Sequence, residues 1–276
     1  MSRENFQISS ENHDLRRNIS RYVEEEFRIC SRNLKVLSDK PNFEPYLAFR
    51  LEIGSRLLMK LLLTSAGITN KKIADALFEL VRKKAEDTAL VFIPTASNKE
   101  KGDKSWLIND LVNLQKQNFK SIDIADISVE DQTIWLPKLE EADVLFFEGG
   151  DTYHLMSWIT KSGLDLLLGE LLKTKVYVGS SAGSMVTGKD LALKISQMVY
   201  GEDFDEIEEM KGLNFVDFYF LPHLNSSYFD KVREKEIKEA TEGMKEKVYA
   251  MDDNSALRIV DGNVEVVSTG EWFVVN

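Results

Sequence analysis

A stretch of small residues that follows an apolar run constrains this chain more than any other feature. Residues 176–187 begin with apolar, mostly β-branched side chains, continue as Gly-Ser-Ser-Ala-Gly and end with helix-compatible residues. This pattern is typical of a sharp strand-to-helix turn that exposes a serine, here Ser181, at the end of a parallel sheet. Gly179 and Gly183 would let the turn tighten without Cβ clashes. An ordinary glycine-rich turn is the alternative, because so short a motif is common by chance.

The segments before this turn alternate between two periodicities. Short apolar runs, typical of buried strands, lie at residues 60–65, 89–94, 122–124, 143–147 and 176–180. Between them are amphipathic segments typical of helices: one carries Ile73 to Leu80, one covers about 106–117, and a third carries Leu155 to Leu172. This alternation predicts a three-layer α/β fold, in which helices cover both faces of a parallel sheet. Ligands bind such sheets at the carboxyl ends of the strands, where Gly149, Gly150 and Ser181 would lie.

The pattern is less regular after Thr187. We expect strands at 218–221 and 247–251, a charged helix from about 228 to 245, and a hairpin over 257–267 whose turn contains Asp261-Gly262. The stretch 201–210 is strongly acidic, and a solvated loop or helix is favoured over a metal site because no His or Cys accompanies it.

Composition excludes several classes of function. The chain has 276 residues, 43% hydrophobic and 29% charged, with a net charge of −11. An acidic chain is a poor general partner for nucleic acid or for an anionic membrane. The one cysteine, Cys30, excludes a disulfide framework and a cysteine-based metal cluster. No apolar run approaches the length of a membrane span, and the first residues lack a signal-peptide core. We therefore expect a cytoplasmic protein that uses no metal or other cofactor.

Residues 1–58 differ from the rest of the chain. Apolar residues recur every three or four positions from Asn12 to Ser38, which predicts an amphipathic helix. A helical appendage packed on the main domain is favoured over a docking helix for a partner. The predicted division is therefore a helical extension at 1–58 and a catalytic domain at 59–276, with self-association left open.

A serine nucleophile needs a base, and the chain offers three histidines. His13 lies in the extension, remote from the sheet. His223 follows an expected strand end on the same edge of the sheet as Ser181, so it is the preferred base. His154, in the first turn of an expected helix, is the lesser candidate.

The orienting acid and the oxyanion donors follow by the same reasoning. Asp252 and Asp253 both follow the strand at 247–251, and either could hold the imidazole. The order Ser…His…Asp differs from that of α/β-hydrolases and indicates another fold. The backbone N–H of Ala182 is one natural oxyanion donor, and that of Gly149 or Gly150 is the second.

Four segments together carry a family resemblance. Residues 59–67, the segment 147–155 with its Gly-Gly-Asp-Thr, the turn at 179–184 and Leu221-Pro222-His223 resemble the peptidase E (aspartyl dipeptidase) family of serine peptidases. The similarity covers about 59–276 and implies a flavodoxin-like fold similar to class I glutamine amidotransferases.

Carried over by position, the resemblance implies roles for individual residues. It makes Ser181 the nucleophile, His223 the base and Asp253 the acid, with Gly150 and Ala182 in the oxyanion region. Arg233 resembles the family's arginine, at a shorter spacing from His223, and would bind the side chain of an N-terminal Asp; a plain surface residue is the equal alternative.

The resemblance implies a serine exopeptidase that hydrolyses short peptides, among them dipeptides with N-terminal Asp, through an acyl-enzyme. Two alternatives remain at this point. One is a β-aspartyl peptidase similar to cyanophycinases, and the other is a catalytically silent interaction or sensor module on the same fold.

Overall fold

The computed structural model describes residues 59–202 and 210–276. The helical extension expected at 1–58 and residues 203–209 of the acidic stretch lie outside the described residues.

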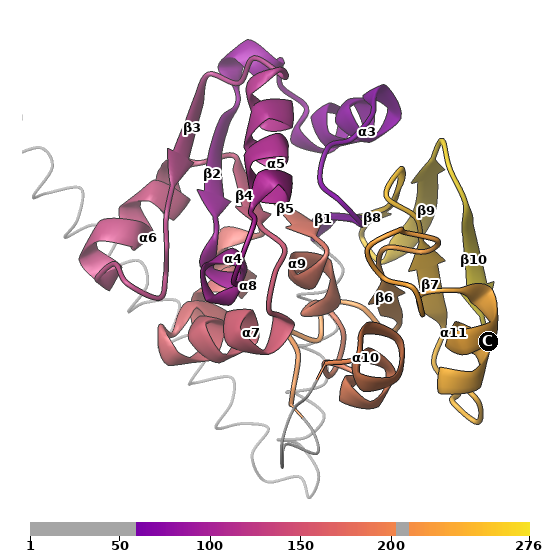
Figure 1. Ribbon diagram of the computed structural model, residues 1–276. Coiled ribbons are helices and arrows are strands. Elements are labelled where there is room, and N and C mark those ends of the chain that lie inside the picture. Colours follow the sequence, from indigo (N-terminus) through magenta and orange to yellow (C-terminus); the bar gives the residue numbers. More distant parts are fainter. Residues whose placement is uncertain (1–58, 203–209) are drawn as a thin grey trace, which may run out of the picture. The chain divides into compact units, whose positions relative to one another are not determined.

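A seven-stranded sheet forms the centre of this part of the chain (Figure 1). Its strands lie in the order β3-β2-β4-β5-β1-β8-β9; the first five are mutually parallel, and β8 and β9 are antiparallel to their neighbours. The bounds are β1 (Lys60–Thr64), β2 (Ala89–Ile93), β3 (Ser121–Ile124), β4 (Val144–Phe147), β5 (Val176–Ser180), β8 (Ser255–Val260) and β9 (Asn263–Ser268). The last two strands form the predicted hairpin.

Helices cover both faces of this sheet. The bounds are α3 (Lys71–Val81), η1 (Ala85–Asp87), α4 (Thr95–Lys99), α5 (Ser105–Gln115), α6 (Gln132–Glu141), α7 (Thr152–Lys161), α8 (Leu164–Leu171), α9 (Ala182–Met185), α10 (Leu193–Tyr200) and α11 (Glu234–Ala240). Leucines of α3 and α5 pack with Phe92 and Phe146 on one face, whereas α6, α7 and α8 pack with Phe147 and Tyr177 on the other. The predicted three-layer, flavodoxin-like fold is confirmed.

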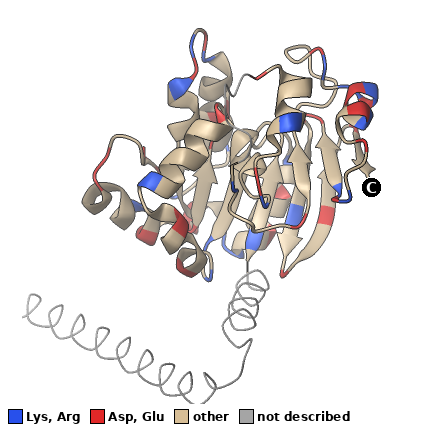
Figure 2. Cartoon of the chain, turned by 90° about the horizontal axis from the view of Figure 1, so that it is seen from below, with Lys and Arg blue, Asp and Glu red and all other residues tan. Residues whose placement is uncertain are grey.

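The distribution of charged residues follows the layers of the fold. In Figure 2, charged residues lie mainly on the helices and loops, and the strands are mostly uncharged. The strands β1, β2, β4 and β5 are buried along nearly their whole length, as parallel strands with two covered faces must be. Within the described part of the chain, no helix combines the length and apolarity needed to cross a bilayer.

A second, smaller sheet was not expected from the sequence. It contains β6 (Tyr219–Leu221), β7 (Val248–Met251) and β10 (Trp272–Val275), in the order β10-β7-β6. The expectation that β6 ends on the same sheet as Ser181 is therefore wrong. Strand β6 pairs with β7 and not with β1, because β8 already occupies the free edge of β1.

Two expected helices are also corrected. The segment carrying Leu155 to Leu172 forms two helices, because the chain turns at Ser162 and Gly163, where Gly163 has a φ of +75°. The charged helix expected from 228 to 245 is limited to α11, since the residues before it form a loop that holds the Arg233 side chain.

Candidate active site

Ser181 stands at the junction of β5 and α9, in a strained backbone conformation. Its φ is +49° and its ψ is −108°, outside the regions that a non-glycine residue normally adopts. The surrounding hydrogen bonds hold it there: its N–H donates to the Thr64 carbonyl at 3.0 Å, and its own carbonyl accepts from Met185 N at 3.0 Å. Strain held by neighbouring structure is typical of functional sites.

The two glycines of the motif are required by packing. A Cβ on Gly179 would lie 2.5 Å from the backbone of Gly183, and a Cβ on Gly183 would overlap the Phe147 carbonyl. The backbone of β5 therefore packs directly against that of α9, and α9 packs directly against the end of β4, with no room for a side chain between them. The turn anticipated from the sequence is confirmed, and each glycine has a steric reason in this chain.

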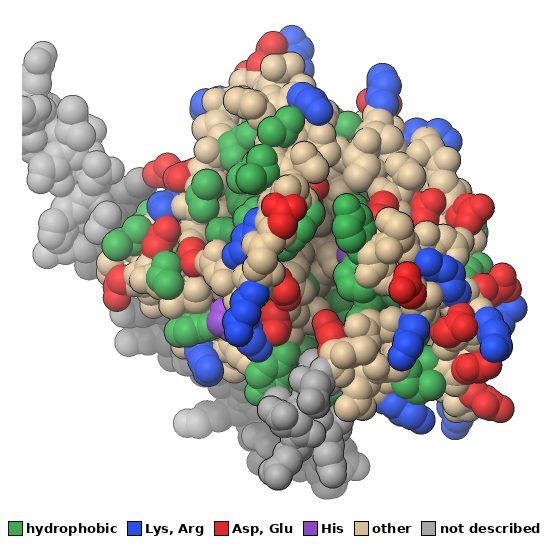
Figure 3. Space-filling model, in the orientation of Figure 1, with side chains coloured by type: hydrophobic (Ala, Val, Ile, Leu, Met, Phe, Trp, Pro, Cys, Tyr) green, Lys and Arg blue, Asp and Glu red, His purple; other side chains and the backbone are tan. Residues whose placement is uncertain are grey.

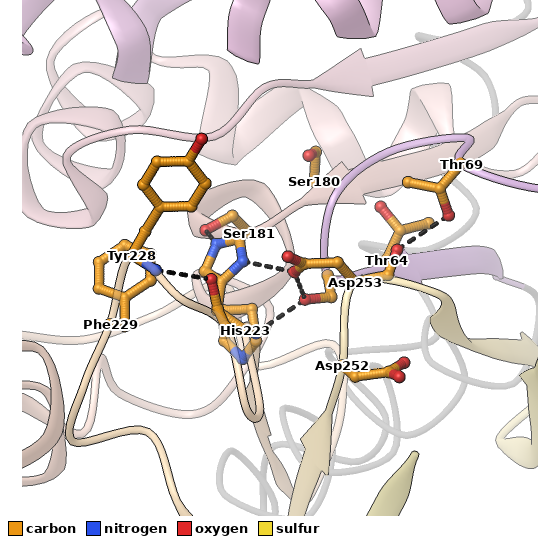
Figure 4. A network of polar contacts seen from close by, with 12 residues as sticks. Thr64, Thr69, Ser180, Ser181, His223, Tyr228, Phe229, Asp252 and Asp253 are labelled. Carbon is orange, nitrogen blue, oxygen red and sulfur yellow. Dashed lines mark hydrogen bonds and ion pairs between the residues drawn. The ribbon is translucent and has the colours of Figure 1, made fainter. Parts of the chain in front are cut away.

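His223 lies next to the serine although it comes from the smaller sheet. It follows β6 after Pro222, with a φ of +65°, and its backbone N–H donates to Ser65 Oγ at 2.7 Å. Its Nε2 lies 2.9 Å from Ser181 Oγ, as Figure 4 shows. The other described histidine, His154, lies on α7 with its ring against Trp158.

Asp253 completes a chain of hydrogen bonds. Its Oδ1 lies 2.7 Å from His223 Nδ1 and accepts a second hydrogen bond from Ser65 Oγ at 2.9 Å. Partial burial alone would raise the pKa of Asp253, but the hydrogen bond and positive charge of His223, with the Ser65 hydrogen bond, hold this pKa below its ordinary value. The carboxylate is therefore ionised at neutral pH and can stabilise a cationic imidazole.

Asp252, the other candidate, has a different partner set. Its carboxylate accepts hydrogen bonds from Ser255 Oγ at 2.5 Å, Asn254 N at 3.0 Å and Glu271 N at 2.6 Å. In Figure 4 it points away from His223. These contacts tie the β7–β8 turn to the loop before β10, which is a structural role.

Two backbone N–H groups stand beside the serine. Ala182 opens α9, so its N–H is one of the unpaired donors of a helix N-terminus. Gly149 and Gly150 follow β4, and a Cβ on Gly149 would lie 3.8 Å from Ser181 Oγ. Gly150 has a φ of +130°, and any side chain there would collide with Ala96. This close approach of backbone to the serine is what an oxyanion site needs.

The loop between β6 and α11 holds the histidine from the other side. The Phe229 ring stacks on the His223 ring, with centroids 4.9 Å apart and planes 22° from parallel. Arg233 donates to the carbonyls of Phe229 at 2.9 Å, Val232 at 3.0 Å and Ser226 at 2.9 Å. The guanidinium thus supports its own loop in this structure, and its contact with a substrate carboxylate stays a prediction.

Sequence reasoning missed Ser65 and Phe229 as parts of the site. Ser65 is fully buried and contacts both the His223 backbone and the Asp253 carboxylate. Its position directly after an apolar strand was the available signal, since such strand ends gather at one edge of the sheet. No comparable signal marks Phe229, because its contact depends on the path of an irregular loop.

A pair of acids lies on the opposite side of the serine. Asp110 of α5 accepts a hydrogen bond from Ser180 Oγ at 3.4 Å, and Glu148, at the end of β4, is fully buried. Burial, together with the nearby Asp110 charge, raises the pKa of Glu148 well above its ordinary value. Burial also raises the pKa of Asp110, to about 6. No group of three or more His, Cys, Asp or Glu side chains suited to a metal occurs among residues 59–202 and 210–276.

Comparisons with known proteins agree with this geometry. The sequence profile of peptidase family S51 matches residues 61–267. An uncharacterized peptidase of Listeria innocua is 27% identical over 68% of this chain and 88% of its own length. A peptidase E of Shewanella oneidensis is 33% identical over 32% of this chain and 36% of its own length.

Solved structures give the same result. A crystal structure of a Listeria monocytogenes protein described as a candidate peptidase E is 26% identical and covers 77% of this chain and 99% of its own, with a TM-score of 0.64. A peptidase from an acI-B1 actinobacterium, at 16% identity and a TM-score of 0.56 over 80% of this chain and 88% of its own, shares the fold. The family match spans most of the chain and contains the whole Ser181 neighbourhood, and the protein is therefore a serine-type peptidase of family S51.

Proposed function

We propose that residues 59–276 form a catalytic domain in which Ser181, His223 and Asp253 act as a catalytic triad on short peptides. One observation carries the proposal: an unbroken chain of contacts from Ser181 Oγ through both ring nitrogens of His223 to Asp253 Oδ1, at 2.9 and 2.7 Å. Each member has a separate reason for its position, since the three come from β5, the end of β6 and the β7–β8 turn.

The chemistry follows from these positions. With Nδ1 protonated and hydrogen-bonded to Asp253, Nε2 of His223 accepts the Ser181 proton as Oγ attacks the scissile carbonyl carbon. The same proton then passes from Nε2 to the departing amine, which leaves an ester on Ser181. Water attacks this ester with His223 again as the base, releasing the acyl product and restoring the hydroxyl.

The oxyanion formed in both steps needs donors, and we assign the N–H groups of Ala182 and Gly150 to it. Ala182 contributes the positive end of α9 as well as its N–H. Gly150 supports the assignment because it follows Gly149, whose Cβ position lies 3.8 Å from Ser181 Oγ, and because its own φ of +130° and its contact with Ala96 exclude a side chain. Removing one such donor typically costs about 2.7–4 kcal/mol of transition-state stabilisation.

The first test concerns the reaction itself. A fluorophosphonate probe should label the wild-type chain and spare Ser181→Ala, and the alanine variant should lose hydrolysis of a dipeptide mixture. A wild-type chain that neither reacts with the probe nor cleaves any peptide would favour the catalytically silent module. Asn254→Ala, on the same turn as the acid but outside the hydrogen-bond chain, is the control for nonspecific loss.

Preference for N-terminal Asp is the finer part of the proposal. Relatives named peptidase E support it, and Arg233 is the cation that we assign to the Asp side chain. Hydrolysis rates of Asp-Leu, Asn-Leu and Leu-Leu test the preference for N-terminal Asp. Hydrolysis of β-Asp-Arg tests the cyanophycinase-like alternative. If Arg233→Ala raises KM for Asp-Leu alone, Arg233 binds substrate. If kcat falls equally for every peptide, Arg233 acts only by holding the loop under His223.

A further inference from the structure

The acid pair next to the nucleophile has no partner in the mechanism above. Asp110 lies in the middle of α5, half-buried over the carboxyl ends of β1 and β5. Ser180, which precedes the nucleophile, donates to its Oδ2 at 3.4 Å, and a Cβ on Gly67 would stand only 3.0 Å from the same oxygen. In Figure 4, Ser180 points to the side opposite His223. The pair therefore lies across Ser181 from the triad.

Glu148 is the unusual member of the pair. Its side chain is fully buried, and neither carboxylate oxygen makes a hydrogen bond of normal geometry within the described chain, although the neighbouring Gly149 N–H acts to lower its pKa. Its carboxyl faces that of Asp110. Two carboxylates in contact cannot both stay ionised, so Glu148 holds a proton that it shares with Asp110. The two together carry about one negative charge beside the reacting serine.

Two lysines of the segment that leads into α5 are engaged elsewhere. Lys99 pairs with Asp151 at 2.7 Å, and Lys104 donates to the Ser97 carbonyl at 2.7 Å. We therefore look to the substrate for the cation that pairs with the Asp110 carboxylate. Figure 3 shows this face of the molecule hollowed near its middle, with acidic, basic and hydrophobic side chains around the hollow.

A peptide with a free N-terminus supplies the missing charge at a fixed distance from the reaction. In the N-terminal residue, only the Cα separates the α-nitrogen from the scissile carbonyl carbon. A group that binds this ammonium must therefore lie within about one residue of the nucleophile. Asp110 is the acid placed near this position, since its hydrogen-bond donor Ser180 precedes Ser181 and the charges of His223 and Asp253 act on it.

We propose that the Asp110 carboxylate, backed by Glu148, is the subsite for the free α-ammonium of the substrate, and that the enzyme releases the N-terminal residue of short peptides. This inference rests on the proposed function, because it places the ammonium by its distance from Ser181. An ammonium provides the hydrogen-bond donors that this carboxylate lacks on its exposed side, and the buried proton on Glu148 prevents a second negative charge from building up.

The test measures binding separately from catalysis. In a Ser181→Ala background, calorimetry compares Asp-Leu with N-acetyl-Asp-Leu. We expect Asp-Leu to bind at least 10-fold more tightly, and Asp110→Asn to remove that difference. Glu148→Gln should keep it, because the Asp110 charge remains. Asp126→Asn, which alters a buried acid hydrogen-bonded to Thr95 and Ser128 on another strand end, should also keep it.

Proton release gives a second readout that a structural role would not affect. Because the pKa of Asp110 is about 6, ammonium binding at pH 6 should release roughly half a proton per site, measured in buffers of different ionisation enthalpy. Glu148, His223 and Asp253 act on Asp110 electrostatically, so the release is compared with that of Asp110→Asn, which should show none.

Each outcome has a distinct meaning. If wild type hydrolyses Asp-Leu and N-acetyl-Asp-Leu equally, or if Asp110→Asn weakens both peptides alike, the ammonium subsite is wrong while the triad stands. If no peptide is hydrolysed and the fluorophosphonate does not react, the proposed function fails, although a 10-fold preference in the Ser181→Ala background would still support the subsite.

Discussion

A carboxylic acid lies on each side of Ser181, but the two acids have different neighbours. On one side, Asp253 accepts hydrogen bonds from His223 and Ser65, and these contacts hold its pKa below the ordinary value. On the other side, Glu148 makes no hydrogen bond of normal geometry within the described chain, and burial together with the Asp110 charge raises its pKa. Burial acts in the same direction on both carboxyls. The neighbours of each carboxyl decide which charge state is stable: His223 and Ser65 favour the ionised Asp253, whereas the Asp110 charge disfavours an ionised Glu148.

The difference in charge state between Asp253 and Glu148 suits the two roles that we propose on the two sides of Ser181. A triad acid must stay ionised so that it can stabilise an imidazolium that forms and disappears in each cycle. A group that waits for a substrate cation can stay partly unsatisfied until the cation arrives. The predictions below change one side at a time, so that the two tasks can be separated.

The largest effect is expected for Asp253→Asn. The amide keeps the shape but favours the wrong imidazole tautomer, so kcat should fall on the order of 10⁴-fold. Asp252→Asn is the matched control on the same turn and should change kcat far less, although its lost acceptor should lower the melting temperature. Steady-state kinetics on one dipeptide measures both variants. Similar losses of kcat in the two would remove Asp253 from the triad.

Ser65→Ala should have the next largest effect. It removes one hydrogen bond to the Asp253 carboxylate and one acceptor for the His223 backbone N–H. We expect kcat to fall about 10- to 100-fold, in line with about 1.5–3 kcal/mol for a hydrogen bond to a charged group. A change in KM alone would contradict this role.

Glu148→Gln should increase stability, by about 1–3 kcal/mol at neutral pH, because the neutral amide does not have to take up a proton on folding, as the buried carboxyl does. The sign depends on pH. A raised pKa means that the folded chain keeps a proton that the unfolded chain has released, so wild-type stability falls as pH rises above the ordinary Glu value. Urea unfolding from pH 4 to 8 should show a gap between variant and wild type that widens with pH. A gap that is constant or reversed would mean that Glu148 is stabilised in its ionised form.

The smallest effect is expected for Thr69→Val. Its hydroxyl donates to the backbone carbonyl of Asp253 at 2.9 Å, and the residue is exposed. Because this contact does not touch the carboxylate, kcat should change less than about threefold. A loss as large as that of Ser65→Ala would show that the position of the turn, rather than the hydrogen bonds to the carboxylate, controls the acid.

Local sequence patterns predicted one half of the site well. Ser181, Gly149 and Gly150 lie at the ends of continuous apolar strands, so their meeting follows from the geometry of a parallel sheet. The His223–Asp253 half was predicted by elimination and by family resemblance. Its supporting contacts were not predicted, because β6 and β7 form their own sheet and no local periodicity says which strand pairs with which.

The acid pair was invisible in the sequence for a different reason. Asp110 lies on an amphipathic helix, where a charged residue normally faces solvent. Glu148 lies at a strand end next to two glycines, where a turn acid would be an ordinary interpretation. Only the three-dimensional packing of α5 over the ends of β4 and β5 brings the two together and removes water from one of them.

The location of Asp253 has a consequence for how this enzyme fails under stress. The aspartate lies in the turn that joins β7 of the small sheet to β8 of the large one, and His223 also follows a small-sheet strand, whereas Ser181 belongs to the large sheet. A slight separation of the two sheets would therefore break the contact between His223 Nε2 and Ser181 Oγ while both sheets keep their own hydrogen bonds. In mild urea, inactivation should precede any loss of circular dichroism, so turnover reports on the fit between the sheets and not on folding alone.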